Sequence, residues 1–192
     1  MRSLTKSEQD SVNYVANQIK ANPQDLIKLI NFESGLNPLA SNKLSSAKGL
    51  IQFIDSTAKK LGYQNSQDLI NRHPTFESQM LGPVLKYLKP LAPYPALSDL
   101  AMAVFMPYAK NFPANTSFTV IYKKLYGENW LKNYTNFEKQ NPGIKSIQDY
   151  VNKVEKKNGT NISTSTKKKE SGVLTSILLA VNAVIYYFVF KK

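Results

Sequence analysis

A helical pattern that ends in a carboxylate, between residues 22 and 35, is the feature that most constrains this chain. Asn22 is a favourable N-cap, Pro23 suits the first helical position, and Gly35 is a typical helix-terminating residue. Between them, apolar side chains recur at helical spacing: Leu26, Leu29 and Ile30. The next position on that stripe is Glu33, where an apolar residue would be expected.

A carboxylic acid on the inward edge of a helix is partly desolvated, and desolvation raises its pKa. A raised pKa is what a general acid that works near neutral pH requires. Alternatively, Glu33 rotates off the stripe at the helix end and reaches water. The spacing alone favours this second interpretation, because buried unpaired glutamates are rare.

The composition argues against disulfide bonds and several kinds of catalytic or metal site. The 192 residues include no cysteine and one histidine, so we expect no disulfide, thiolate metal site or histidine-based zinc site. A Ser–His–Asp triad is also not expected, since His73 precedes a proline at a predicted surface turn. We therefore expect no metal and no cofactor, and carboxylates, hydroxyls and amides remain as the reactive groups.

The charge is strongly basic, at +12, and unevenly distributed. Residues 1–150 hold 17 basic and 11 acidic side chains, whereas residues 151–192 hold 8 and 2, so each part contributes +6. A basic surface attracts nucleic acid, anionic lipid or an anionic glycan. The chain has no nucleic-acid-binding motif, so we expect no nucleic-acid partner.

Several short motifs follow Glu33 in a recognisable order. They are Glu33-Ser34-Gly35, Gly49-Leu50-Ile51-Gln52, Asp55-Ser56-Thr57-Ala58 and an apolar segment from Ser98 to Pro107. Together they resemble the Glu-Ser-Gly, Gly-Leu-Met-Gln and Pro-x-Thr-Ala motifs of soluble lytic transglycosylases, and the last is similar to a core helix of phage-encoded members. The resemblance covers roughly residues 10–113.

The resemblance implies a mainly α-helical, lysozyme-like domain, which we assign to residues 1–152, acting on peptidoglycan glycan strands. By the same resemblance, Glu33 protonates the glycosidic oxygen and then takes a proton from the muramoyl C6 hydroxyl, giving a 1,6-anhydro product. We assign substrate binding to Ser34, Gln52, Phe53 and Tyr108. We expect Gln52 on a helix over 49–61, off its apolar stripe, with its amide free for a sugar.

Further helices are predicted from local signals. One over about 6–20 follows a capping box from Thr5 to Glu8, and another follows Thr75, with a kink or break at Pro83. Ser98 is expected to cap a buried helix that is apolar over 100–106. A last helix begins near Pro142 or Ser146, and Ile147, Val151 and Val154 form its apolar stripe.

One segment departs from the family pattern. Where many transglycosylases carry Ala-Tyr-Asn-Ala-Gly, this chain has Val104-Phe105-Met106-Pro107-Tyr108. Tyr108 is the hydroxyl that remains to contact the glycan, from a shifted position. Aromatic residues between 115 and 134 offer further stacking surfaces, although we predict them mainly as core, with a membrane interface as another alternative.

Three alternatives to the lyase stay open. A lysozyme-like hydrolase would need a second carboxylate, for which Asp55 and Glu77 are the candidates. A catalytically weak virion protein could keep the fold as a membrane scaffold. The altered segment around Phe105 favours this alternative, and the joint retention of Glu33, Ser34 and Gln52 opposes it. A small basic protein with one terminal span could also be a lesion-forming accessory protein.

The sequence of the C-terminal part predicts a linker followed by a membrane anchor. Residues 153–171 are polar and basic, typical of a linker. The next 19 residues, 172–190, carry no charge, close to the roughly 20 needed to cross a bilayer. Lysines flank both ends, so the orientation is not determined. With no signal peptide predicted, we expect a bacteriophage protein held in an internal virion membrane, with other virion membrane or capsid proteins as further partners. We expect it to open the host periplasmic cell wall during entry.

If residues 172–190 span a bilayer, the full-length protein should sediment with membranes and resist extraction by high salt or alkali. Deleting residues 160–192 should leave a folded, soluble domain, because a span gains its stability from lipid rather than from the core. Flotation and extraction assays test this. Complete release by salt would contradict it, since only an electrostatic attachment is screened away.

Overall fold

The computed structural model of the chain describes residues 2–159, which form helices joined by turns and loops. The first helix, α1 (Lys6–Ile19), begins at Thr5 with a capping box, in which Thr5 and Glu8 each accept a hydrogen bond from the other's backbone amide. The second, α2 (Pro23–Ser34), is capped by the Asn22 side chain and ends at Gly35, whose φ of 65° is left-handed. Both helices were predicted with nearly these bounds.

Short helices follow in the middle of the chain. They are α3 (Asp55–Lys60), α4 (Ser66–Arg72), α5 (Phe76–Gln79), η1 (Met80–Val84), α6 (Leu85–Leu88) and η2 (Lys89–Leu91). The predicted disturbance at Pro83 is confirmed, because η1 is one turn of π-helix between α5 and α6. Thr75 caps α5 as expected.

The third part holds α7 (Leu97–Phe105), η3 (Pro107–Ala109), α8 (Phe118–Tyr126), η4 (Gly127–Asn129), α9 (Trp130–Gln140) and α10 (Ile147–Lys157). Every residue of α7 from Leu100 to Phe105 is buried, as its apolar sequence predicts. Phe118 and Tyr122 are also core residues, whereas Tyr126, Trp130 and Tyr134 are partly buried.

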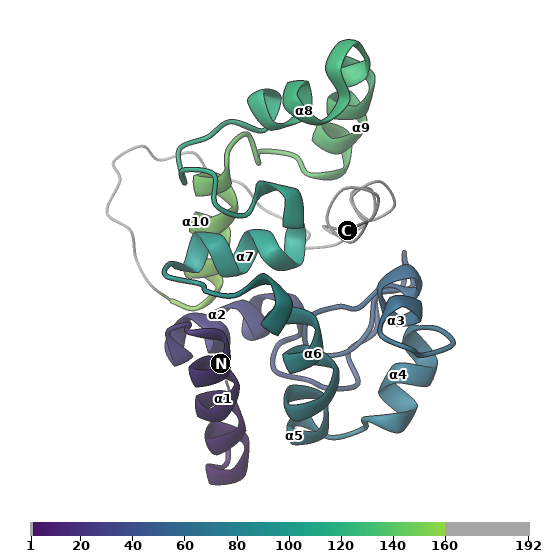
Figure 1. Cartoon of the computed structure of the whole chain (residues 1–192), viewed down its shortest axis with the longest axis vertical. Coiled ribbons are helices and arrows are strands. Elements are labelled where there is room, and N and C mark those ends of the chain that lie inside the picture. Colours follow the sequence, from purple (N-terminus) through teal and green to yellow (C-terminus); the bar gives the residue numbers. More distant parts are fainter. Residues whose placement is uncertain (1, 160–192) are drawn as a thin grey trace.

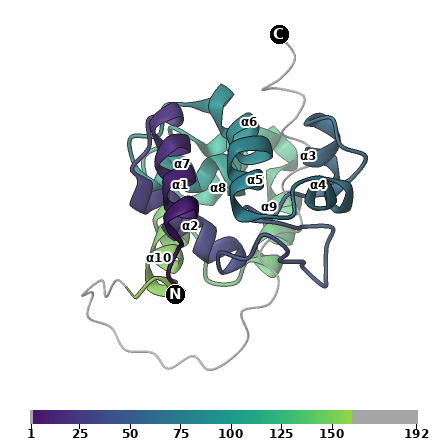
Figure 2. The ribbon, with the colours of Figure 1, turned by 90° about the horizontal axis from the view of Figure 1, so that it is seen from below.

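Three helices from distant parts of the sequence meet in the middle of the molecule. Helices α2, α7 and α10 pack on one another in all three pairings. Figure 1 shows them between α1 with α3–α6 on one side and the α8–α9 hairpin on the other, and Figure 2 shows the same molecule from below. The C-terminal end of α2, which carries Glu33, therefore lies among helices formed by residues 97–157.

Two local predictions are wrong. Residues 49–54 are not helical: they form a tight turn closed by hydrogen bonds between Lys48 and Phe53, so α3 begins at Asp55. The turn needs left-handed backbone at Gly49 and at Gln52, which a helix cannot contain. Ser98 does not cap α7, whose N-cap is Ala96 without a side-chain hydrogen bond.

The C-terminal predictions lie largely outside the described residues. Helix α10 continues to Lys157, so it overlaps the first five residues of the linker expected at 153–171. No helix within residues 2–159 is both long and apolar enough to cross a bilayer. The predicted span at 172–190 is not among the residues described.

Candidate active site

Glu33 lies in the last turn of α2, and one of its carboxylate oxygens is held by a side chain from the far end of the chain. The hydroxyl of Tyr150, on α10, donates a hydrogen bond to Glu33 Oε1 at 2.7 Å. Glu33 keeps part of its surface open to solvent, whereas Tyr150 is fully buried. The carboxyl group therefore has one fixed partner inside the protein and an open side toward solvent.

The position of Tyr150 is itself tightly defined. A capping box between Ser146 and Asp149 fixes the start of α10 at Ile147, three residues before Tyr150. The Tyr150 ring stacks on Phe105 of α7, with centroids 4.2 Å apart, and meets Phe32 of α2 edge-on at 5.4 Å. Rings in these arrangements attract one another beyond simple burial. The hydroxyl is thus presented to Glu33 by a rigid aromatic cluster.

The pKa of Glu33 is raised from 4.5 to about 7, chiefly because burial disfavours its charged form. Two effects oppose burial: the hydrogen bond from Tyr150 and the positive charge of Lys157. Lys157 Nζ donates to the backbone carbonyl of Phe32 at 2.8 Å, which keeps its ammonium group beside the end of α2. Near neutral pH, Glu33 can therefore both hold and release a proton.

Ser34 and Gln52 occupy different parts of the structure. Ser34 follows Glu33 and donates to the Ile30 carbonyl one turn earlier, so its hydroxyl proton is used within α2. Gln52 lies in the 49–54 turn, 7% exposed, and its Nε2 donates to the Gly49 carbonyl at 2.9 Å. This differs from the expectation of a free helical amide. Gln52 Oε1 has no hydrogen-bond partner among the described residues, so it is the atom available to a ligand.

Phe53 and Tyr108, the other two predicted substrate contacts, differ in how much surface they expose. Phe53 is only 2% exposed and packs edge-on against Tyr87, so it offers a ligand almost no surface. Tyr108 is half-buried in η3, near the ring of Phe112. Within the described residues, Glu33 is hydrogen-bonded to Tyr150 and feels the positive charge of Lys157. None of the four predicted substrate contacts acts on it in this way.

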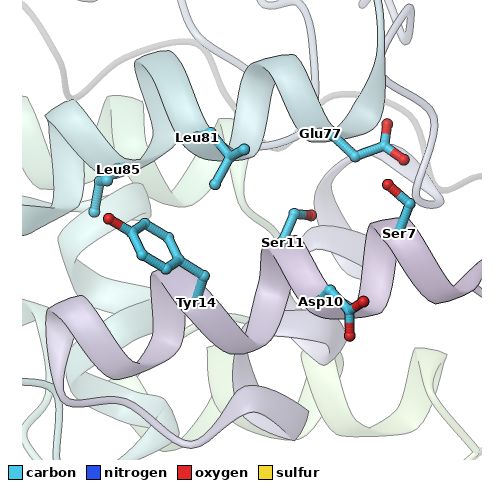
Figure 3. A pocket seen from close by; sticks show the side chains of 7 residues that line it. All are labelled: Ser7, Asp10, Ser11, Tyr14, Glu77, Leu81 and Leu85. Carbon is cyan, nitrogen blue, oxygen red and sulfur yellow. The ribbon is translucent and has the colours of Figure 1, made fainter.

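Neither candidate second carboxylate is paired with Glu33. Asp55 accepts hydrogen bonds from the Ser66 backbone amide and hydroxyl, and these lower its pKa from the usual value. Glu77 lines a separate groove of about 540 Å³ between α1 and the α5–α6 segment, where it faces Ser7 (Figure 3). A second catalytic carboxylate at roughly 5 Å would raise the pKa of Glu33 by charge repulsion. Among residues 2–159, none of the charges that shift this pKa is a carboxylate.

A ligand set for a metal is also missing from this part of the chain. Residues 2–159 contain no cluster of three or more His, Cys, Asp and Glu side chains. The polar groups that act on Glu33 are a phenol and an ammonium group, and both can donate hydrogen bonds to oxygen atoms. The arrangement suits proton transfer to and from a bound sugar oxygen.

Sequence reasoning missed Tyr150 and Lys157. Tyr150 lies on the predicted apolar stripe of the last helix, beside Ile147, Val151 and Val154, and all four are buried. A tyrosine on a buried face needs a hydrogen-bond partner for its hydroxyl, and Glu33 was another polar group on the apolar stripe of a helix. The sequence could therefore have indicated that Tyr150 and Glu33 are hydrogen-bonded to each other. It gave no such indication for Lys157, because Lys157 is one of several lysines near the helix end.

The fold and site together define an all-α domain with a glutamic acid of raised pKa at the end of a central helix. Residues 10–85 match the family model of the Transglycosylase SLT domain. The matched segment is less than half of the 192 residues, and the match supports a peptidoglycan lytic transglycosylase activity. A search of curated proteins found no match. Tyr150 and Lys157 lie outside the matched segment.

The raised pKa predicts a pH-dependent loss of stability. Between pH 4.5 and about 7 the unfolded chain loses the Glu33 proton while the folded protein keeps it, so the free energy of unfolding falls as pH rises through this range. The difference between the two pKa values corresponds to a loss of about 3 kcal/mol in the free energy of unfolding. Glu33→Gln should remove this loss, so its advantage over wild type should grow from pH 4 to pH 8 in urea titrations. Glu77→Gln, as control, should follow wild type.

Tyr150→Phe should keep the aromatic cluster and lose the hydrogen bond. Because that bond favours ionised Glu33, the pKa of Glu33 should rise further, and the alkaline limb of the pH–rate profile should move to higher pH. The rate should fall about 10–100-fold, since hydrogen bonds to charged groups contribute about 1.5–3 kcal/mol. Tyr122→Phe, a buried tyrosine outside this contact, is the matched control. An unchanged pH limb would show that Tyr150 does not act on Glu33.

Proposed function

We propose that this protein cleaves the glycan strands of peptidoglycan as a lytic transglycosylase, with Glu33 as its only acid–base group. The observation that carries the proposal is the Tyr150–Glu33 contact. It holds a carboxyl group whose pKa is near 7 at a partly open surface, and no carboxylate of residues 2–159 is among the charges that shift that pKa. The match of residues 10–85 to the Transglycosylase SLT domain supports the choice of substrate.

The reaction needs one carboxyl group in two successive roles. Protonated Glu33 donates its proton to the oxygen that links N-acetylmuramic acid to N-acetylglucosamine, and the C1–oxygen bond breaks. The resulting carboxylate then accepts the proton of the muramoyl C6 hydroxyl, and the C6 oxygen forms a bond with C1. The 1,6-anhydro ring closes, and Glu33 returns to its protonated form without a water molecule.

The environment of Glu33 suits both roles. Burial keeps the carboxyl protonated before cleavage, and the Tyr150 hydroxyl and the Lys157 charge stabilise the carboxylate that exists between the two steps. An acid whose pKa lies near the working pH is an effective donor and an effective acceptor. Tyr150 also limits the rotation of the carboxyl group, which favours transfer to a fixed sugar oxygen.

We further propose that the domain is a bacteriophage virion protein tethered by residues 172–190 to an internal membrane, from which it opens the host cell wall locally. The support is in the sequence: an uncharged 19-residue segment follows a polar, lysine-rich stretch. A small domain on such a tether would act only where the particle meets the wall.

Product analysis tests the activity and separates it from hydrolysis. Digestion of purified peptidoglycan in heavy-oxygen water should give 1,6-anhydromuramic ends without label, as read by mass spectrometry. Labelled reducing ends would mean hydrolysis, and intact glycan with folded protein would favour a scaffold.

Glu33→Gln should lower the cleavage rate by about 10²–10⁴-fold, because the amide cannot donate the proton. Asp55→Asn and Glu77→Gln should leave the product and the rate close to those of wild type. A wild-type rate in Glu33→Gln would refute the role of this residue, and loss of activity in either control would point to a second carboxylate.

A further inference from the structure

Gln79, at the end of α5, is a fully buried polar side chain that touches three separate backbone segments. Its Nε2 donates to the carbonyls of Pro38 at 2.6 Å and His73 at 2.9 Å. Its Oε1 accepts from the amide of Leu50 at 2.9 Å. A buried amide with both ends bonded to backbone acts as a cross-link, since breaking any one bond would leave a buried polar group unsatisfied.

Two of these three bonds fall on opposite ends of one loop. Residues 36–53 contain no helix. This loop begins after α2 and includes the turn that holds Gln52. Within the loop, the Gly49 amide bonds to the Ala40 carbonyl at 2.8 Å. Gln79 adds a bond at Pro38, near the start, and one at Leu50, near the end, so it ties both ends of the loop to α5.

Gly49 shows how closely Gln79 approaches the loop. A Cβ atom at position 49 would lie 2.6 Å from Gln79 Oε1, and Gly49 also has a φ of 80°. Both features exclude a larger side chain here. The contact between Gln79 and the loop backbone thus depends on a residue without a side chain at the first position of the Gln52 turn.

We infer that Gln79 is a positioning residue: by joining the two ends of the 36–53 loop, it fixes Gln52 relative to Glu33. The inference rests on the proposed function, in which Glu33 transfers the proton and Gln52 Oε1 is free to contact the glycan. Glu33 itself is held from the other side, by Tyr150 of α10. Loss of Gln79 should therefore displace Gln52 and leave the acid where it is.

This separation gives a specific kinetic expectation. Gln79→Met keeps side-chain length and removes all three hydrogen bonds. Misplacement of a substrate contact by about 1 Å can cost 10²-fold in rate, so we expect kcat/KM to fall about 10–100-fold. The alkaline limb of the pH–rate profile should stay unchanged, because Tyr150 and Lys157 are not part of the loop.

The experiment compares Gln79→Met with Tyr94→Phe, which also removes a buried hydrogen bond to a backbone carbonyl, at Leu88. Hydrogen exchange by mass spectrometry should show faster exchange across residues 36–53 in Gln79→Met and unchanged exchange there in Tyr94→Phe. Gly49→Ala, which disturbs the same contact from the loop side, should reproduce the Gln79→Met pattern and serves if that variant does not fold.

The outcomes separate the two proposals. Wild-type exchange across residues 36–53 in Gln79→Met, or activity equal to that of Tyr94→Phe, would overturn the role of Gln79. A shift of the pH limb in Gln79→Met would also overturn it, because the acid itself would then have moved. Inactivity of the wild-type protein would refute the proposed function alone, since exchange is measured without substrate and still decides whether Gln79 holds the loop.

Discussion

The hydrogen bond between Tyr150 and Glu33 is the constraint on which the centre of this protein depends. A buried carboxyl group without a partner is costly, and so is a buried phenol. Each group satisfies the other, across 117 positions of sequence. The bond therefore allows an acid to occupy a position on α2 where an apolar side chain would be more stable, and it ties the first part of the chain to the last helix.

The same junction explains why the domain extends beyond the segment that matches the transglycosylase family. Residues 10–85 carry the acid, but the hydrogen bond and the charge that moderate the effect of burial on its pKa come from α10. Asn158, just after α10, strengthens the connection by accepting from Asn31 and donating to the Lys28 carbonyl on α2. Without α10, Glu33 would lose its partner and its burial, and its pKa would return toward that of an ordinary glutamate.

The helices around Glu33 could be predicted because their signals are local. Caps at Thr5, Asn22, Thr75 and Ser146 and the glycine at 35 mark helix ends by short-range hydrogen bonds, and the structure confirms them. The turn around Gln52 could not be predicted, because its apolar residues also fit a helix and the left-handed backbone is imposed by the fold. The Tyr150 contact is a tertiary pairing, which periodicity within one helix cannot reveal.

The altered segment at Phe105 can now be judged by its position. In the pattern of many transglycosylases a tyrosine stands where this chain has Phe105, which is 4% exposed and stacks on Tyr150. A hydroxyl at that buried position would need its own partner, whereas an unsubstituted ring supports Tyr150 without competing for Glu33. The departure at Phe105 therefore leaves the environment that tunes the acid complete.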